Sequence, residues 1–296
     1  MNWQAELQAL GIMQADVPLA PRTTLGVGGK AAWLFRPSDK ANLMAALSLI
    51  PTDVMIFPLG RGSNVLIADR GIDGLVLDLG DMNSLVIEGE IIKVGAGVRM
   101  SKLAQAAANH GLTGLEFTAT VPGDLGGGVA MNAGAFGQQV SDVLQSVDVL
   151  YRDGRVACLS RDELSMRYRY TKLPQDTLIV SATLKLESRD TEQVKNTMRE
   201  MRSQRSDSQP LALPNCGSVF KNPEGDFAAR LIESVGLKGE QRGKARISEV
   251  HANFIVNEGG ASSEDVLALM RLAKAEVKAF TNIDLEPEVK LVGCSL

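Results

Sequence analysis

Two side chains that can do chemistry, Cys216 and Ser218, flank a glycine in the segment NCGSVFKNP, residues 215–223. A thiolate is a nucleophile, and a serine hydroxyl can also take part in catalysis when its surroundings activate it. Nothing next to Cys216 in the sequence suggests thiolate activation, so we interpret it as a small packed residue. Ser218 could act in catalysis or be a turn hydroxyl that satisfies a backbone group, and the second is the more common role.

Two pairs of charged residues leave a similar choice open. Arg167 and Arg169 lie in MRYRY, and Glu286 and Glu288 lie in LEPEV. In an extended chain, residues i and i+2 point to the same face, so spacing does not choose within either pair. His251 in HANFIVN is about equally suited to a substrate contact and to a hydrogen-bonded structural role.

Three glycine-rich segments expose backbone that could approach a ligand closely. GRGSN (60–64) follows the apolar run VMIFPL, and free N–H groups in such a turn can bind a phosphate. It lacks the third glycine of the Rossmann fingerprint, and the chain has no Walker A loop. With TTLGVGG (23–29) and VPGDLGGGVAMNAGAFG (121–137), it suits a large ligand with a pyrophosphate and flat rings. Arg205 could reach a diphosphate, although a helix-surface charge is the more common explanation.

The composition limits the class of protein. A chain of 296 residues exceeds the usual single core and indicates two or three domains. The balance of 31 Lys and Arg against 35 Asp and Glu gives no support for binding to nucleic acid or a membrane surface. Three cysteines without a CxxC favour reduced thiols in the cytoplasm, and two histidines do not favour a metal site. The start of the chain does not resemble a signal peptide, and no apolar run reaches membrane-spanning length.

The hydrophobic pattern predicts the elements that must position these residues. Strands are expected at AAWLFR, VMIFPL (buried), GLVLDLG, LVIEG, IIKVGAG and TLIVSATLKLE. QSVDVLYRDGRVACLS predicts a hairpin with a type I′ turn at Asp153-Gly154. Helices are expected at the N-terminus, at SDKANLMAALSLI, at MSKLAQAAANHGL ending at Gly111, and at TEQVKNTMREMRSQR. After Gln209-Pro210 a second α+β unit follows, with helices FAARLIESVG and SSEDVLALMRLAKAEVKAF and strands HANFIVN and LEPEVKLVG. The long helix is predicted to begin with a capping box between Ser262 and Asp265.

The ordered set PLGRGSNVL, GLEFTATVPGDLGG, MNAGAFG, YRYT, GSVFKNP, HANFIVN and LEPEV resembles the UDP-N-acetylenolpyruvoylglucosamine reductase family, also called UDP-N-acetylmuramate dehydrogenase. The resemblance runs from about Arg22 to Gly293. It implies an α+β fold with two FAD-binding subdomains of the vanillyl-alcohol-oxidase/PCMH type and a smaller α+β substrate-binding domain. The expected bounds are 1–78 joined by the C-terminal strand 285–296, then 79–208, then 209–284.

The resemblance also implies a reaction in bacterial peptidoglycan precursor synthesis. NADPH would reduce FAD and leave, and the enolpyruvyl sugar nucleotide would then accept a hydride at C3 and a proton at C2. We expect a small-molecule substrate, a cytoplasmic location and no nucleic-acid, membrane or obligate protein partner. Two alternatives are an FAD dehydrogenase of the same fold acting on another small substrate, and a non-redox UDP-sugar-binding protein.

By the same resemblance, Arg169 polarises the enolpyruvyl carboxylate, Ser218 donates the proton and Glu288 works with Arg169. The residues expected to face the substrate are Tyr168, Lys221, Asn222 and His251. The residues expected to bind FAD are Gly60, Arg61, Gly62, Ser63, Asn64, Thr118, Pro122, Gly123, Gly126, Gly127, Asn132 and Gly134.

Several positions depart from the family pattern. Thr120 stands where glycine is expected, and Asp124 places a negative charge in a loop expected near the FAD phosphate. Arg246 and Val250 are also atypical. The short interval between YRYT and GSVFKNP is similar to the shorter class of the family, which lacks an inserted loop carrying a substrate-facing tyrosine.

Overall fold

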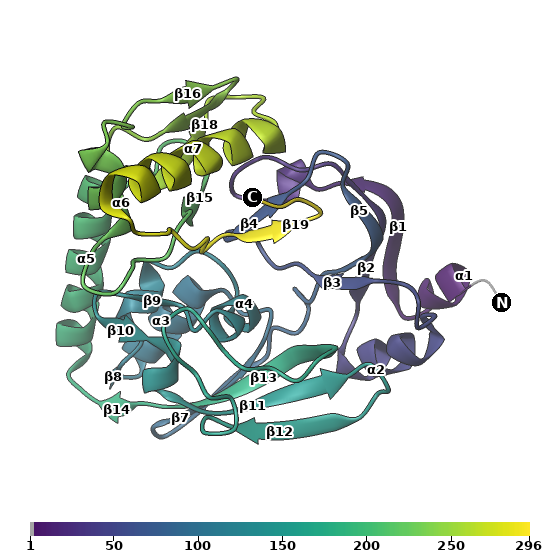
Figure 1. The fold of residues 1–296 in the computed structure, drawn as a ribbon. Helices are drawn as coiled ribbons and strands as arrows, with labels where there is room; N and C mark the ends of the chain where they lie inside the picture. The colour runs from purple at the N-terminus through teal and green to yellow at the C-terminus, as the bar shows by residue number, and fades with distance from the viewer. Residues whose placement is uncertain (1–2) are drawn as a thin grey trace. The chain divides into compact units, whose positions relative to one another are not determined.

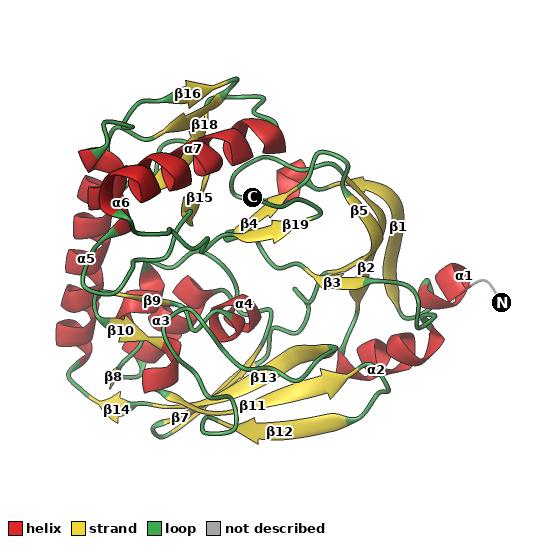
Figure 2. Cartoon of the chain, viewed as in Figure 1, coloured by secondary structure: helices red, strands yellow, loops and turns green. Residues whose placement is uncertain are grey.

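The computed structural model describes residues 3–296, which form two compact units. Unit 1 contains 3–14, 33–60 and 75–205, and unit 2 contains Ala15–Ala32, Arg61–Gly74 and Ser206–Leu296. The helices and strands are mixed along the chain, as the α+β prediction requires (Figure 2). No helix among the described residues is both long enough and apolar enough to cross a membrane.

Unit 1 is built around an antiparallel sheet with the strand order β12-β11-β13-β7-β6 (Figure 1). The strands are β6 (Leu85–Glu88), β7 (Ile91–Gly95), β11 (Leu144–Tyr151), β12 (Val156–Ser160) and β13 (Thr177–Lys185). Helix α3 (Met100–Asn109) buries Met100, Leu103 and Ala107 in the same core, and its spacing is that of one helix face. Gly111, with φ of 65°, follows its end, as predicted.

The hairpin between β11 and β12 forms where it was predicted, but its turn type differs from the prediction. A type I′ turn needs positive φ at both central residues, and of Asp153 and Gly154 only Gly154 has it, at 85°. The Gly154 N–H donates to the Tyr151 oxygen, and the Tyr151 N–H donates to the Arg155 oxygen. The loop is therefore one residue longer, with Gly154 in the left-handed position of a three-residue hairpin.

The chain before residue 209 also contains a second, four-stranded sheet and a helix of 18 residues. A four-stranded sheet has the order β1-β2-β5-β3, with β3 (Ile56–Pro58) parallel to β5 (Ile72–Leu77). The run VMIFPL does not form the fully buried strand that we predicted, because only 56–58 are extended and Met55 is 47% exposed. The remaining elements are α1 (Trp3–Leu7), β1 (Gly11–Pro18), η1 (Ala20–Arg22), β2 (Lys30–Pro37), α2 (Lys40–Leu49), β8 (Leu112–Thr113), η2 (Glu116–Ala119), α4 (Leu125–Ala130), β9 (Gly134–Ala135), β10 (Gln138–Gln139), η3 (Val140–Asp142), β14 (Glu187–Ser188) and α5 (Thr191–Ser208).

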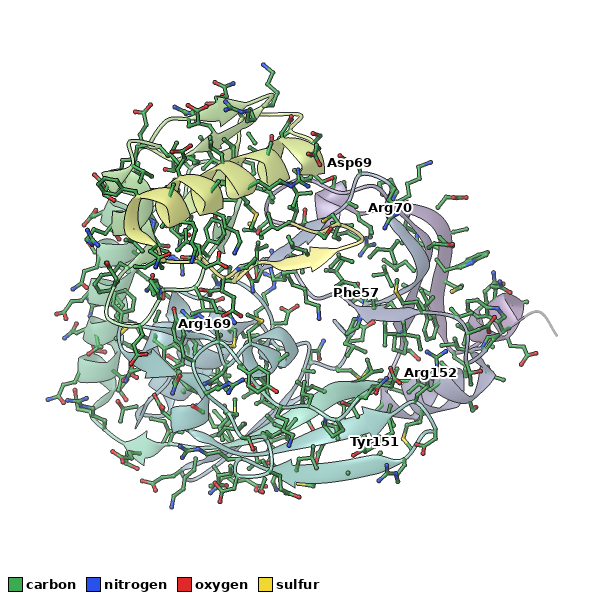
Figure 3. All side chains as sticks on the ribbon, viewed as in Figure 1. Phe57, Asp69, Arg70, Tyr151, Arg152 and Arg169 are labelled. Atoms are coloured by element: carbon green, nitrogen blue, oxygen red, sulfur yellow. The ribbon has the colours of Figure 1, made fainter. Side chains whose placement is uncertain are left out.

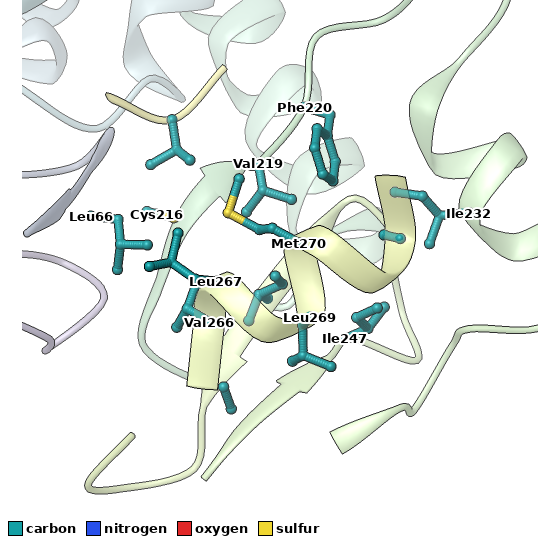
Figure 4. Packing of buried hydrophobic residues seen from close by; sticks show 14 of the residues in the cluster. Leu66, Cys216, Val219, Phe220, Ile232, Ile247, Val266, Leu267, Leu269 and Met270 are labelled. Atoms are coloured by element: carbon teal, nitrogen blue, oxygen red, sulfur yellow. The ribbon is translucent and has the colours of Figure 1, made fainter. Parts of the chain in front are cut away.

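Unit 2 packs two helices and a four-stranded antiparallel sheet around its own core. The sheet has the order β15-β18-β17-β16, with β15 (Asn215–Ser218), β16 (Gln241–Arg242), β17 (Ala245–Ile247) and β18 (Phe254–Asn257). Helices α6 (Ala228–Ser234) and α7 (Ser263–Thr281) contribute Ile232, Leu267 and Met270 to this core (Figure 4). The predicted capping box between Ser262 and Asp265 at the start of α7 is confirmed.

The C-terminal segment is less regular than predicted. Of LEPEVKLVG only β19 (Lys290–Val292) is a strand, and it pairs in parallel with β4 (Val65–Ile67), as Figure 1 shows. The preceding residues 285–289 form no regular strand, and they include an isolated antiparallel β-bridge between Phe220 and Pro287. Within unit 2, the segment after GRGSN and the end of the chain are therefore neighbours.

Candidate active site

A β-bulge separates Cys216 from Ser218. Strand β15 pairs with β18, but its register shifts between Asn215 and Ser218. Gly217 has φ of 78°, a left-handed conformation that glycine adopts without steric cost. Residues 216 and 218 would share a face in a regular strand, and the bulge breaks this alternation. Cys216 consequently packs in the core of unit 2 (Figure 4) and is 2% exposed. Ser218 is partly exposed.

The two candidate side chains differ in their chemistry as well. Burial raises the pKa of the Cys216 thiol to about 12, with a further contribution from the negative charge of Glu288. The thiol therefore stays neutral and serves packing, as predicted. Among the residues that the structure describes, none forms a hydrogen bond with the Ser218 hydroxyl. The turn-hydroxyl alternative required such a bond, so the structure favours a hydroxyl that is available to a ligand.

Glu286 and Glu288 lie in different surroundings. This difference helps to decide which of the two is the better candidate for a catalytic carboxylate, a choice that their spacing left open. The Glu286 side chain is 70% exposed and forms an ion pair with Lys221. Glu288 is partly buried, and its N–H donates to the Val219 oxygen over 2.9 Å. This hydrogen bond holds the Glu288 backbone next to Val219, the residue that follows Ser218. The Glu288 carboxylate is therefore the better candidate to act with the Ser218 hydroxyl.

The substrate-facing candidates of unit 2 have identifiable roles within the chain. The Asn222 side-chain oxygen accepts the N–H of Ala228 at the start of α6. His251 lies edge-on to Phe254 with ring centroids 4.8 Å apart, and its Nδ1 accepts the Asn253 N–H. Burial lowers the pKa of His251, so the ring is held neutral. These contacts are those of the structural histidine that the sequence left as an alternative.

Asn253 is a positioning residue that the sequence analysis did not identify. It is 2% exposed, its Nδ2 donates to the Phe220 oxygen, and its Oδ1 accepts the Phe220 N–H. Its own carbonyl oxygen accepts the Val219 N–H. Three hydrogen bonds therefore fix the chain directly after Ser218. The available signal was an amide directly before the apolar run Phe254–Val256, because an amide that is buried with such a run must find partners.

In unit 1, Arg169 lies on a tight turn and not on an extended strand. The N–H of Arg167 donates to the Tyr170 oxygen, and the N–H of Tyr170 donates back to Arg167, each over 3.0 Å. Arg169 has φ of 53° at the third position of this turn, where glycine is usual. Its Nη2 donates to the Gly134 oxygen over 2.9 Å, and its guanidinium lies 4.9 Å from the Tyr168 ring centroid. Figure 3 labels Arg169.

The turn distinguishes the two arginines. Arg167 is exposed, with its guanidinium over the Tyr170 ring, whereas Arg169 is partly buried. Tyr168 and Tyr170 are 46% and 39% exposed, so two aromatic faces stand beside the arginines at the surface of unit 1. Aromatic faces next to a fixed cation suit a planar, anionic ligand.

The GRGSN turn leaves backbone donors available. Among the described residues, none accepts a hydrogen bond from the N–H groups of Arg61, Gly62 or Asn64. Gly62 has φ of 59°, and a Cβ there would lie 2.5 Å from the Arg22 oxygen. Its carbonyl oxygen is held by the Thr24 N–H. The turn thus contains backbone N–H groups without an acceptor in the described chain, and such groups can bind phosphate oxygens. This property fits a cofactor that carries a pyrophosphate. Gly60 and Ser63 complete the same turn.

The second glycine-rich segment contains both exposed backbone and buried anchors. Pro122 and Gly127 are exposed, and Gly123, Gly126 and Gly134 are partly exposed. Thr118 and Asn132 are completely buried. The Thr118 hydroxyl donates to the Leu115 and Met100 oxygens, so it acts inside the unit.

Thr120 and Asp124, the two residues of this segment that depart from the family pattern, both have close neighbours in unit 1. Thr120 is buried, and its hydroxyl donates to the Phe117 oxygen. Arg205 is not the exposed helix charge that the sequence favoured, because it is largely buried and donates to the Thr120 oxygen. Burial lowers the pKa of Arg205. Asp124 precedes α4, and a Cβ on Gly60 would lie 2.8 Å from its carboxylate.

Comparison with known proteins places both parts of the chain in a class. Residues 31–160 match the family described as an FAD binding domain. Residues 209–292 match the C-terminal domain of UDP-N-acetylenolpyruvoylglucosamine reductase. An FAD-binding fold followed by a reductase domain defines a flavin-binding oxidoreductase, and the predicted fold class is confirmed.

Relatives along nearly the whole chain identify the family. The reductase of Anaeromyxobacter sp. is 44% identical over 296 residues, which cover 99% of this chain and 93% of the relative. That of Bacillus subtilis is 40% identical, covering 96% of this chain and 95% of the relative. The crystal structure of the enzyme from Thermus caldophilus superposes with a TM-score of 0.83 at 37% identity, covering 95% of this chain and 100% of that one. The chain therefore belongs to the UDP-N-acetylenolpyruvoylglucosamine reductase family.

Proposed function

We propose that the protein catalyses the NADPH-dependent reduction of UDP-N-acetylglucosamine enolpyruvate to UDP-N-acetylmuramate, with FAD as the cofactor. The observation that carries this proposal is the Ser218 hydroxyl, which the Gly217 bulge turns out of the core and leaves without a hydrogen-bond partner among the described residues. Membership of the family supports the substrate class.

The reaction adds a hydride and a proton across the enolpyruvyl double bond. FAD supplies the hydride carrier between NADPH and the substrate. The hydride forms a C–H bond at C3, and the electron pair of the double bond moves to C2 and its carboxylate. Ser218 then gives its hydroxyl proton to C2, which completes the lactyl ether and leaves the serine to regain a proton. A serine hydroxyl is a weak acid, but an enolate is basic enough to take its proton.

Arg169 and Glu288 would act on the charge that develops during this transfer. A fixed guanidinium near the substrate carboxylate stabilises the enolate as it forms. Glu288 would work with Arg169 and keep the reacting end of the substrate oriented, since its backbone is fixed beside Val219. The hydride and the proton are added to adjacent carbons, so both donors must be positioned next to the same double bond.

The remaining candidates would hold the two ligands. The N–H groups of the 60–64 turn and the exposed backbone of 122–134 would bind FAD, the former through its phosphates. Lys221, Asn222 and Tyr168 would face the sugar nucleotide, whereas His251 has the contacts of a structural residue. Lys221 already has an acidic partner in Glu286, so the substrate would have to compete with or share that contact.

We further propose a cytoplasmic role in peptidoglycan precursor synthesis, and hence in maintaining cell shape and division, without an obligate protein partner. All three cysteines are free thiols, which suits a reducing compartment.

The test is to record the flavin spectrum of the purified protein and to follow NADPH oxidation with and without the enolpyruvyl sugar nucleotide. We expect a yellow protein whose NADPH oxidation accelerates when the substrate is added. A flavoprotein without this acceleration would indicate a dehydrogenase for another substrate. A colourless protein that cannot be reconstituted with FAD would leave a UDP-sugar-binding protein and overturn the proposal.

A further inference from the structure

The turn that carries Arg169 adopts a conformation that its own sequence does not favour. Arg169 has φ of 53°, and side chains other than glycine, asparagine and aspartate rarely adopt this region. Such a conformation persists when the surrounding contacts determine it. The turn is short, since only Arg167 and Tyr170 pair across it. Contacts from outside the turn must therefore help to hold it.

Asn132 supplies one of those contacts from the glycine-rich segment. Its Nδ2 donates to the Arg167 carbonyl oxygen over 3.0 Å and to the Gln139 side-chain oxygen over 3.0 Å. Its Oδ1 accepts the Ser141 N–H over 2.9 Å. Its exposed fraction is zero, so water does not compete for these bonds. The amide thereby joins the turn to the chain that follows it, at the residue where the turn begins.

The same segment also holds the arginine side chain. Asn132 has φ of 43°, which asparagine tolerates better than most residues, and two residues later the Gly134 oxygen accepts the Arg169 Nη2. The Asn132 backbone therefore helps to place the Gly134 oxygen, which accepts from the guanidinium. The Asn132 side chain helps to place the turn through its bond to Arg167. Asn132 thus bonds the residue where the turn begins, and it lies two residues before the acceptor of the Arg169 guanidinium.

We propose that Asn132 is a positioning residue that holds Arg169 in its working geometry. This role differs from the direct FAD contact that the family pattern suggested, because both polar atoms of the Asn132 side chain are used within the unit. The effect on catalysis rests on the proposed function of Arg169, whereas the anchoring of the turn does not.

Hydrogen exchange tests the anchoring without reference to activity. In Asn132→Gly, which keeps the positive φ and removes the amide, we expect the paired amides of Arg167 and Tyr170 to exchange at least about tenfold faster. Asn132→Asp keeps the Oδ1 acceptor and loses the donor, so it should show the same change if the glycine variant does not fold. Ser181→Ala, which removes the hydrogen bond from Ser181 to Asp148 elsewhere in unit 1, is the matched control. Unchanged exchange at these two amides in both Asn132 variants would overturn the proposal.

A double-mutant cycle tests the link to catalysis. Asn132→Gly should slow the reoxidation of the reduced enzyme by the enolpyruvyl sugar nucleotide by about tenfold or more, and should leave flavin reduction by NADPH unchanged. In an Arg169→Ala background the same substitution should have no further effect, because it acts through Arg169. Additive effects would show that Asn132 acts elsewhere, for example on FAD. If the unmodified protein does not react with this substrate, the proposed function fails, while the exchange result still decides whether Asn132 anchors the turn.

Discussion

The Asn64 side chain donates a hydrogen bond from its Nδ2 to the main-chain oxygen of Glu288 over 3.1 Å. The Asn64 carbonyl oxygen in turn accepts the N–H of Lys290 over 3.0 Å. The last residue of the predicted FAD turn is thus bonded on both sides of Val289 to the segment that carries the predicted catalytic acid. Within unit 2, the two features cannot shift independently without breaking these bonds.

Replacing Asn64 with alanine should therefore affect more than cofactor affinity. We expect the free energy of unfolding to fall by about 1 kcal/mol, because a partly buried hydrogen bond is lost. Reoxidation by the enolpyruvyl sugar nucleotide should slow as well, since Glu288 loses an anchor. Chemical denaturation and stopped-flow absorbance measure the two effects. Asn83→Ala, which removes an exposed bond to the Gly80 oxygen, should change neither. A variant that only binds FAD more weakly would argue against this coupling.

The assignment of proton delivery to Ser218 predicts a separation of the two half-reactions. In Ser218→Ala, flavin reduction by NADPH should proceed normally, and the oxidative half-reaction should slow by about 10²- to 10⁴-fold. Cys216→Ala should leave both rates nearly unchanged and should cost about 1 kcal/mol of stability through lost packing. Equal losses in both half-reactions of Ser218→Ala would contradict the assignment and indicate a general defect in the fold or in FAD binding.

The local signals in the sequence were sufficient for most of the regular elements. Helices α3 and α7 were predicted because the apolar spacing and the residues that begin or end each helix are local in the sequence. Examples are Gly111 after α3 and the Ser262 capping box of α7. The family order of motifs gave the cofactor-binding fold. The run VMIFPL misled because apolar composition does not report which face of a short strand is covered.

The details of the candidate site depend on long-range contacts that a single sequence does not show. The hydrogen bond from Asn132 to Arg167 spans 35 positions, and that from Asn64 to Glu288 spans 224. The positive φ at Arg169 could not be read from MRYRY, because nothing in the motif marks a residue in the left-handed region. The bulge at Gly217 was equally hidden, since a glycine between two polar residues is compatible with either register.

The buried thiol predicts a pH dependence of stability. The pKa of Cys216 is raised from its ordinary 9.0 to about 12 by burial and by Glu288. The buried neutral thiol contributes fully to stability below pH 9, the pKa of the cysteine in the unfolded chain. This contribution is lost as the pH rises from about 9 toward 12, by up to about 1.4 kcal/mol per pH unit. Between pH 8 and 10.5, the unfolding free energy should fall about 2 kcal/mol more in the unmodified protein than in Cys216→Ala. Cys158→Ala, at an exposed thiol, should behave like the unmodified protein. Identical pH profiles for the unmodified protein and Cys216→Ala would refute the burial argument.

The rigid turn at Gly62 predicts a loss of FAD on a minimal substitution. Gly62→Ala places a methyl group 2.5 Å from the Arg22 oxygen and 2.7 Å from the Thr23 Cα, which are backbone atoms, at positive φ. We expect the purified variant to contain much less flavin and to unfold more easily by about 2 kcal/mol or more. Absorbance at the flavin band and thermal melting measure this. Gly154→Ala has a similar φ of 85° with open space around it, so it should show only the smaller strain and keep its flavin. Full flavin content in Gly62→Ala would show that the turn can relax.

The strained turn at Arg169 predicts that stability and activity separate. Arg169→Gly removes the positive-φ strain and the guanidinium together, whereas Arg169→Ala removes only the guanidinium. The glycine variant should therefore be more stable than the alanine variant by up to about 1 kcal/mol. Both should slow the oxidative half-reaction by about 10²-fold or more, because the cation that stabilises the developing charge is lost. Asn282→Gly, at the left-handed end of α7 with φ of 61°, is the matched control and should leave both half-reactions unchanged. Restoration of the rate in Arg169→Ala by free guanidinium would support a role for the charge itself. An Arg169→Gly variant that remains fully active would remove Arg169 from the mechanism.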